Sequence, residues 1–371
     1  MPWPDAWTHT ATAQRLQFGA GGVDRVGELV RELGARRVLL VTSPGRQASE
    51  DGERVVRALG RLLAGTYAEA RPHVPTSSVQ GALLQARRDG VDGLVSFGGG
   101  SCADLAKAVA FFVEQEAGTP GASHVDRPAL PHVVVPTTYA PAALTAAFAM
   151  TDERTRTKSL GGGPTLAPGA AVYDPQVTLD LPVVTSAATA LDALAACVEV
   201  VCSPVRTPEA EVVALAGAAG IARALPGVVD DPVDADARGE LLAAAALGAR
   251  ALQNAAPGVH HGLAHLLGGR AGAPHGLLSA VLLPHVMRFN GDAVPDAMAR
   301  LGQALGDPDD AAGAVARLLE RAGVPTRLSA CGVAAEDLDA VARLSQGQRA
   351  VQRNVRPVGE LDARAILEDA Y

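Results

Sequence analysis

Lysine and aromatic residues are scarce in this chain of 371 residues, and positive charges do not outnumber negative ones. Aromatic residues make up only 3% of it, so Ala, Leu and Val must build the core. The 32 Lys and Arg residues against 40 Asp and Glu residues leave a formal charge of −8. Such a chain lacks the basic face that binds nucleic acids by releasing phosphate counterions, so we expect no nucleic-acid partner.

Membrane and secretory features are also missing. The apolar runs are Ala-rich or interrupted by charge, and none reaches the roughly 20 residues that a membrane span needs. The N-terminus, residues 1–5, has neither the basic nor the apolar region of a signal peptide. The four cysteines have no metal-finger spacing and are expected to be free thiols. We therefore predict a cytoplasmic protein with no membrane partner.

Strand and helix patterns alternate in the first half of the chain, and helical patterns fill the second half. Alternation of this kind predicts a parallel sheet covered by helices on both faces. We predict a Rossmann-like parallel α/β nucleotide-binding domain over residues 1–180 and an α-helical domain over residues 181–371. Apolar runs predict strands at residues 37–42, 93–97, 132–136 and 171–173, and a Gly- and Pro-rich segment predicts a loop at 160–168.

A glycine-rich turn follows the predicted strand 93–97. Gly98, Gly99 and Gly100 precede Ser101, which would cap the next helix. Glycines at a strand-to-helix turn let a phosphate approach the backbone and the helix N-terminus, so we predict a phosphate or pyrophosphate cradle. A merely flexible turn is the alternative.

Only two basic residues are lysines, Lys107 and Lys158; the other 30 are arginines. A lysine retained in such a chain indicates a place that needs a compact ammonium group. Chance survival on a solvated face is the alternative.

Histidines cluster in the second half: five of the nine lie between residues 260 and 285. His261 and His265 are one helical turn apart, His275 follows, and Asp192 lies upstream in an apolar helical stretch. An Asp with His residues from separate helices can form a divalent-metal site. Hydrogen-bonded core imidazoles are the alternative.

Taken together, these segments resemble the iron-containing (group III) alcohol dehydrogenase superfamily, and within it the maleylacetate reductases. The resemblance covers nearly the whole chain and includes the segments 17–21, 98–107, 135–139, 173–182, 192–199, 260–269, 274–290 and 354–357. It implies an N-terminal NAD(P)-binding domain, a C-terminal helical domain and an active site in the cleft between them. It also implies a homodimer that acts on a small-molecule substrate.

The resemblance assigns roles to particular residues. His261, His265 and His275 would be catalytic. In place of the Asp that often follows the first strand in NAD-preferring members, this chain has Ser43 with Arg46 nearby, so NADPH should be accepted as well as NADH. The cofactor-binding residues would be Thr42, Ser43, Gly99, Gly100, Ser101, Asp104, Thr137, Thr138 and Lys158.

Two departures from the family pattern affect chemistry. Asp192, His261 and His275 match three of the four metal ligands, but the fourth position is Ala196. Three ligands with a water can hold iron or zinc, whereas the resemblance to maleylacetate reductases implies a metal-free site, and both possibilities stay open. The segment 141–143, Pro-Ala-Ala, replaces the expected Gly-Ser-Glu and predicts a less polar substrate than maleylacetate.

The leading hypothesis is an NAD(P)H-dependent reductase of the maleylacetate reductase-like group, acting on a small oxo-acid-like carbonyl compound. The imidazoles would supply the proton. The alternatives are a repurposed lyase or cyclase without net redox chemistry, and a non-catalytic protein that binds a small molecule. The Ala- and Arg-rich composition indicates a bacterial genome.

Overall fold

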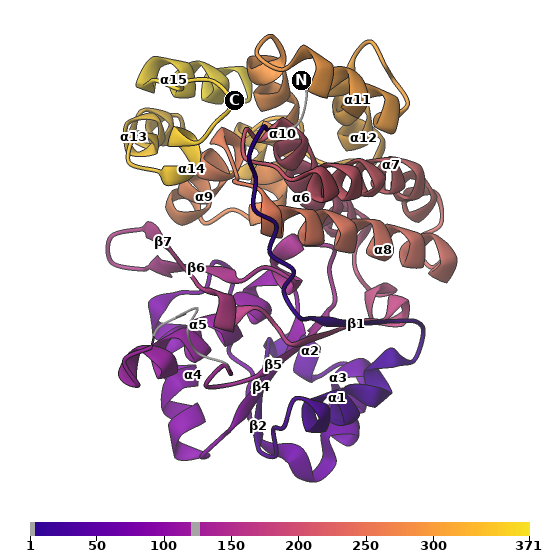
Figure 1. The fold of residues 1–371 in the computed structure, drawn as a ribbon, viewed down its shortest axis with the longest axis vertical. Coiled ribbons are helices and arrows are strands. Elements are labelled where there is room, and N and C mark those ends of the chain that lie inside the picture. The colour runs from indigo at the N-terminus through magenta and orange to yellow at the C-terminus, as the bar shows by residue number, and fades with distance from the viewer. Residues whose placement is uncertain (1–3, 120–126) are drawn as a thin grey trace. The chain divides into compact units, whose positions relative to one another are not determined.

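The chain forms two compact units, a sheet unit and a helical unit (Figure 1). The computed structural model describes residues 4–119 and 127–371, so residues 1–3 of the N-terminal segment lie outside the described residues. The sheet unit comprises Ala11–Thr138 and Ala142–Leu179. The helical unit comprises Met1–Thr10, Tyr139–Pro141 and Asp180–Tyr371. Among the described residues that we assigned to the first domain, the segments 4–10 and 139–141 therefore pack with the helices.

A six-stranded parallel sheet in the order β1-β8-β5-β4-β2-β3 forms the centre of the sheet unit, which confirms the predicted α/β class. The residues of β2, β4, β5 and β8 are buried throughout, because helices cover both faces. The strands are β1 (Arg15–Phe18), β2 (Val38–Thr42), β3 (Leu63–Tyr67), β4 (Gly93–Gly98), β5 (His132–Pro136) and β8 (Ala170–Tyr173).

Alternate strand residues feed two separate cores. Leu40 packs on one face with α1 (Val26–Glu32) and α3 (Glu50–Leu59). Its neighbour Leu39 packs on the other face with α4 (Thr76–Arg88) and α5 (Gly100–Glu116). Each fully buried leucine contributes about 1.5–3 kcal/mol, so these two layers stabilise the sheet without many aromatic rings.

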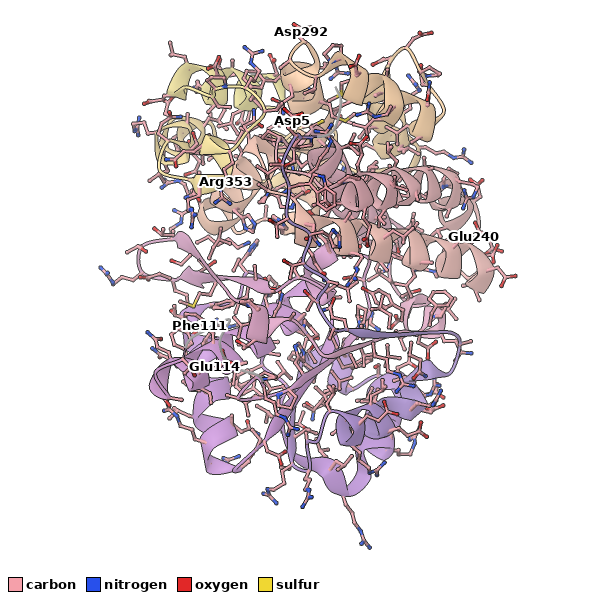
Figure 2. All side chains as sticks on the ribbon, in the orientation of Figure 1. Asp5, Phe111, Glu114, Glu240, Asp292 and Arg353 are labelled. Atoms are coloured by element: carbon pink, nitrogen blue, oxygen red, sulfur yellow. The ribbon has the colours of Figure 1, made fainter. Side chains whose placement is uncertain are left out.

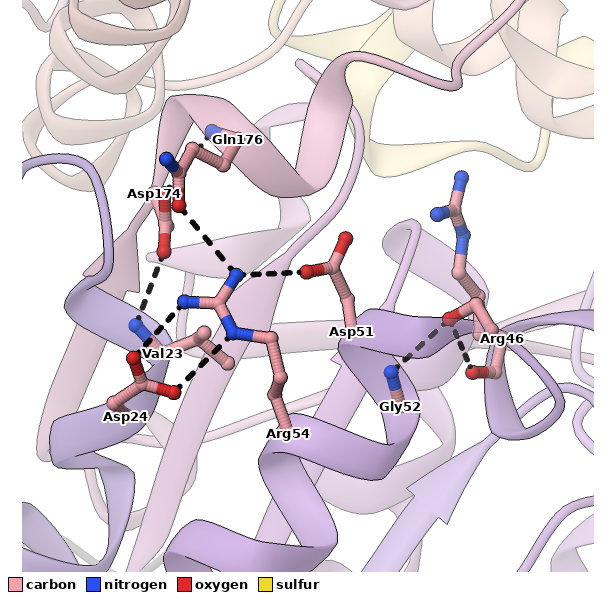
Figure 3. Close-up of polar contacts among 9 residues, drawn as sticks. Val23, Asp24, Arg46, Asp51, Gly52, Arg54, Asp174 and Gln176 are labelled. Carbon is pink, nitrogen blue, oxygen red and sulfur yellow. Dashed lines mark hydrogen bonds and ion pairs between the residues drawn. The ribbon is translucent and has the colours of Figure 1, made fainter.

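Polar contacts tie the start of the sheet unit to its last strand (Figure 3). Asp174, fully buried after β8, accepts hydrogen bonds from the backbone N–H of Val23 (3.2 Å) and of Gln176 (3.0 Å). Arg54 of α3 pairs with Asp24 and Asp51, each at 3.0 Å. The segment 173–175, which carried part of the family resemblance, therefore has a structural role.

A β-hairpin corrects one prediction. Strands β6 (Ala147–Asp152) and β7 (Thr157–Gly162) pair antiparallel, so residues 160–162 belong to a strand and not to the predicted loop. β7 is largely exposed, and no apolar run marks it in the sequence.

Lys107 of α5 fixes the segment that leads into this hairpin. Its ammonium group is fully buried and pairs with Asp104 at 2.8 Å. It also donates hydrogen bonds to the carbonyl oxygens of Ala142 (3.0 Å), Thr145 (3.4 Å) and Ala147. A compact group with three N–H donors suits acceptors that lie in several directions.

The helical unit is built around α6. It contains α6 (Val183–Cys202), α7 (Pro208–Asp230), α8 (Ala235–Ala251), α9 (Val259–Ala271), α10 (His275–Gly291), α11 (Pro295–Leu305), α12 (Ala311–Arg321), α13 (Ala335–Ser345), α14 (Arg349–Gln352) and α15 (Glu360–Asp369). Our expectation that no segment reaches the length of a membrane span was wrong for α6 and α7, which qualify by length and composition. The most apolar window is 78% buried in α6 and 44% buried in α7, and α6 forms part of the protein core.

Arg238 of α8 holds Tyr139–Pro141 in the helical unit. Its fully buried guanidinium donates hydrogen bonds to the Tyr139 hydroxyl (3.3 Å), the Ser186 hydroxyl (3.1 Å) and the Leu181 carbonyl (2.8 Å). The Tyr139 N–H donates to Thr189 Oγ1 at 3.3 Å. These contacts explain why a segment that follows a strand packs among helices.

His132 should make the stability of the sheet unit depend on pH. Its buried Nε2 lies 2.7 Å from Ser96 Oγ, and burial lowers its pKa from 6.5 to about 3, with a further contribution from Lys107. As the pH falls from 6.5 toward 3, His132 takes up a proton in the unfolded chain before it does so in the folded protein. The free energy of unfolding should then fall by about 1 kcal/mol per pH unit below 6.5.

Urea unfolding of the wild type and of His132→Asn across this pH range tests the prediction. The variant should show a shallower dependence on pH. Equal slopes for His132→Asn and the wild type would contradict the assignment.

Candidate functional site

Three segments predicted to bind a cofactor lie side by side at the carboxyl edge of the sheet. In the strand register Thr42 is opposite Phe97, and Gly98 is opposite Pro136. The chain leaves β2 for β3 on one side and returns to β4 on the other, so the strand order reverses between β2 and β4. Parallel α/β sheets bind ligands outside the carboxyl ends of strands at such a point.

The glycine turn is packed so closely that side chains are excluded. Gly98 has a φ of +148°, and a Cβ there would lie 2.5 Å from Cys102 Sγ. A Cβ on Gly99 would lie 3.2 Å from Thr138 Cγ2, and the Thr137 N–H donates to the Gly98 carbonyl at 3.0 Å. The partly buried glycine backbone before α5, free of side chains, therefore suits a phosphate group.

Several predicted cofactor residues have partners within the protein. Ser101 is not the helix cap that we predicted: Gly99 occupies the N-cap position and Ser101 is the second residue of α5. Thr42 donates its hydroxyl to the Phe97 carbonyl at 2.7 Å. Ser43 caps α2 (Pro44–Gln47) by accepting from the Arg46 N–H at 3.4 Å.

Asp104 and Lys158 belong to the connection between α5 and the hairpin. One Asp104 carboxylate oxygen pairs with Lys107 and the other accepts from the Ala149 N–H at 3.1 Å. Lys158 lies partly exposed on β7, opposite Thr151. The roles of both residues in cofactor binding stay predictions.

The histidine cluster of the helical unit is built by three helices. On each helix two of the polar residues are four or seven positions apart and so share one helix face, and His260 precedes His261 on α9. The residues are Asp192 and Glu199 of α6, His260, His261 and His265 of α9, and His275 and Ser279 of α10.

Glu199 and His261 form its deepest pair. His261 Nδ1 lies 2.5 Å from Glu199 Oε2, and the side chains are only 10% and 5% exposed. Burial alone would lower the pKa of His261, but the Glu199 carboxylate reverses this and raises it. For Glu199, burial would raise the pKa, and the attraction of His261 outweighs it and lowers the pKa. With Nδ1 donating to Glu199, Nε2 is the ring atom left for chemistry.

A second polar chain runs through Ser279. His260 Nε2 donates to the Ser279 carbonyl at 2.8 Å, and Ser279 Oγ donates to Asp192 Oδ1 at 2.7 Å. His275 Nε2 lies 3.7 Å from the same Asp192 oxygen. Burial lowers the pKa of His260, which favours its neutral form.

The structure brings the three predicted catalytic histidines together. The rings of His261 and His265 are 6.2 Å apart, and those of His265 and His275 stack at 5.0 Å. Exposure rises along this row, from the buried His261 to His275, whose side chain is 27% exposed. Each of these imidazoles is a candidate to donate or accept a proton near neutral pH.

The predicted metal ligands are arranged less favourably. Ala196 offers no ligand, Asp192 Oδ1 accepts from Ser279, and His261 faces Glu199. In the described part of the chain, the group whose ligand atoms lie within 4.8 Å of one another is Glu199, His260 and His261, not the predicted trio. Asp192, His261 and His275 therefore do not converge on one point, and Ala196 supplies no fourth ligand, so the predicted donor set does not fit a four-coordinate iron or zinc ion.

Sequence reasoning missed Glu199, His260 and Ser279 as site residues. Glu199 carried a signal, because it lies seven residues after Asp192 and therefore on the same face of an apolar helix. The contributions of His260 and Ser279 depend on how α9 and α10 pack, which no local pattern shows.

Comparisons with known proteins identify the relatives of this chain. Residues 13–175 match the family model "Iron-containing alcohol dehydrogenase", and residues 186–371 match "Fe-containing alcohol dehydrogenase family, C-terminal". A maleylacetate reductase from Rhizobium sp. (strain MTP-10005) is 34% identical over 98% of this chain and 97% of its own length.

Solved structures show the same fold. The crystal structure of maleylacetate reductase from Agrobacterium tumefaciens matches with a TM-score of 0.85 at 32% identity, over 99% of this chain and 98% of that one. A sulfoacetaldehyde reductase from Bifidobacterium kashiwanohense, solved in complex with NAD+, matches with a TM-score of 0.84 at 21% identity, over 100% and 99% of the two chains.

Replacing Glu199 should change the protonation of His261. In Glu199→Gln the attraction of the carboxylate is lost and burial remains, so the pKa of His261 should fall below its wild-type value. Loss of the charged hydrogen bond should also cost about 1–3 kcal/mol of stability. Histidine-selective NMR titration and urea unfolding measure the two effects.

Glu211→Gln is the matched control. Glu211 is equally buried in the helical unit but pairs with Arg206 and Arg300. This variant should lose stability and leave the His261 titration unchanged. An unchanged titration in Glu199→Gln would show that the pair does not set the protonation of His261.

Proposed function

This chain belongs to the iron-containing alcohol dehydrogenase family, where it is a reductase of the maleylacetate reductase-like group, and we propose that it reduces a small oxo acid with NADPH or NADH. The observation that carries the cofactor assignment is the glycine turn at the point where the strand order reverses. The relatives named as reductases also favour this proposal over the lyase, cyclase and non-catalytic alternatives.

The residues have distinct tasks in the proposed reaction. The nicotinamide cofactor, when bound, supplies a hydride to the carbonyl carbon of the substrate. Gly98 and Gly99 keep the backbone open toward the pyrophosphate, and the N-terminus of α5 stabilises its negative charge. The carbonyl oxygen gains a proton from the row of His261, His265 and His275.

We infer that the enzyme accepts NADPH. Ser43 puts no carboxylate at the start of α2 that would repel a 2′-phosphate. Arg46 lies close enough to the glycine turn to lower the pKa of Cys102, which burial raises to about 12. Its side chain extends away from the Asp24–Arg54 contacts (Figure 3).

We also propose that the reaction needs no metal ion, since the donor set of Asp192, His261 and His275 does not fit one. The substrate should have an apolar part beside its carbonyl group, because the segment 141–143 offers Pro and Ala side chains. Action as a cytoplasmic homodimer stays a prediction.

Carbonyl reduction and metal dependence can be tested in one assay. The purified enzyme should oxidise NADPH only when a small oxo acid is present, with one hydroxy acid formed per NADPH consumed. Pretreatment with a chelator should leave the rate within about twofold. Product formed without NADPH oxidation would favour the lyase or cyclase. Activity lost on chelation and restored by iron or zinc would overturn the metal-free proposal.

Arg46→Ser should weaken NADPH selectively. Loss of a charge-assisted hydrogen bond to the 2′-phosphate should raise the KM for NADPH by about 10–100-fold and leave the KM for NADH unchanged. Arg57→Ser removes an exposed arginine of α3 and should change neither constant. Equal effects of Arg46→Ser on both cofactors would contradict the assigned role.

A further inference from the structure

The C-terminal part of the helical unit contains a cavity of about 360 Å³ whose lining residues have not yet been given a role. Cavities of this volume lie within the range that binds small molecules. Apolar side chains and amide groups line it around one guanidinium, and the main residues are Gln346, Val351, Gln352, Asn354, Val355 and Arg356.

Arg356 is held in one orientation. Its guanidinium stacks 4.3 Å over the Phe289 ring, and one N–H group donates to the Phe289 carbonyl at 3.0 Å. Among the described residues no carboxylate forms an ion pair with it. The remaining N–H donors form the planar fork that suits a carboxylate.

The surrounding segment is strongly basic although the chain carries a charge of −8. Between Asp339 and Glu360 there are four arginines and no acidic residue: Arg343, Arg349, Arg353 and Arg356. Arg353 is exposed (Figure 2) and lines a narrow cavity, of about 10 Å³, that adjoins the larger one. The local charge therefore attracts anions.

The cavity also adjoins the histidine cluster. Asn354 and Val355 line both cavities, and the narrow one reaches Glu199, the partner of His261. Val351 packs on α9 directly after His261, where a Cβ on Gly262 would lie 2.6 Å from Val351 Cγ2. An anion held at Arg356 would thus lie next to the residues proposed to supply the proton.

From these contacts we propose that Arg356, assisted by Arg353, binds the carboxylate of the substrate and fixes its orientation. The inference rests on the proposed function in taking the ligand to be an oxo acid. A carboxylate matches the single planar fork and the apolar floor of Val351 and Val355, which suits a short carbon chain. Carboxylate binding at Arg356 also explains how the protein can bind an anionic substrate although the segment 141–143 is apolar.

Calorimetric titration of the full chain with levulinate, a small oxo acid, and with its neutral methyl ester tests the proposal. The wild type should bind levulinate at least about 10-fold more tightly than the ester. Arg356→Gln should weaken levulinate binding by about 10–100-fold and leave ester binding unchanged, and Arg356→Lys should restore only part of it. Arg353 is exposed, so Arg353→Gln should fold like the wild type. This variant should bind levulinate about threefold more weakly than the wild type.

Arg343→Gln is the matched control outside the cavity and should bind levulinate like the wild type. Equal levulinate affinity in folded Arg356→Gln and the wild type would overturn the inference, and so would inorganic phosphate competing as strongly as levulinate. NADPH titration of the same samples separates the two proposals. A wild type that binds NADPH but not levulinate overturns the carboxylate site alone, whereas failure to bind NADPH counts against the proposed function.

Discussion

Charged groups buried in an interior of Ala, Leu and Val must find their partners inside the protein, and this constraint shapes both units. In the sheet unit, the ammonium group of Lys107 draws in Asp104 and the backbone carbonyls of residues 142, 145 and 147. In the helical unit, the carboxylate of Glu199 is met by His261. A buried charge without a partner would cost several kcal/mol of stability. Each of these charged groups therefore fixes the position of the segment that supplies its partners.

The same constraint explains how the histidine cluster holds together with an alanine at position 196. Ala196 lies between Asp192 and Glu199 on one face of α6. Glu199 orients His261 by a hydrogen bond, His275 lies 3.7 Å from Asp192, and the ring of His265 stacks on that of His275. In this structure the imidazoles are positioned by hydrogen bonds and packing.

Patterns of neighbouring residues predicted the buried central strands and the glycine turn. Continuous apolar runs marked β2, β4, β5 and β8, and the glycine turn was expected where it lies. The strands β1, β3 and β7 were missed because their residues are largely or partly exposed and form no continuous apolar run. Strand β6 was missed although residues 147–150 are apolar. The clustering of histidines was visible in the sequence, but His261 and Glu199 are 62 positions apart on different helices, so their pairing needed the structure. Lys107 was rightly singled out, and its partners proved to be the Asp104 carboxylate and backbone carbonyls of its own unit.

The anchoring of Tyr139–Pro141 by Arg238 has a consequence for the synthesis of this protein. The chain contributes to the helical unit, then to the sheet unit, and returns to the helical unit twice. On the ribosome, the residues up to 179 can complete their sheet early, whereas Tyr139 must wait for α8, about 100 residues later, before its hydroxyl meets the Arg238 guanidinium. A fragment that starts at residue 181 would lack this segment and expose a buried cation. The two units are therefore distinct in structure, but the helical unit is complete only when it includes a segment encoded within the sheet-unit part of the chain.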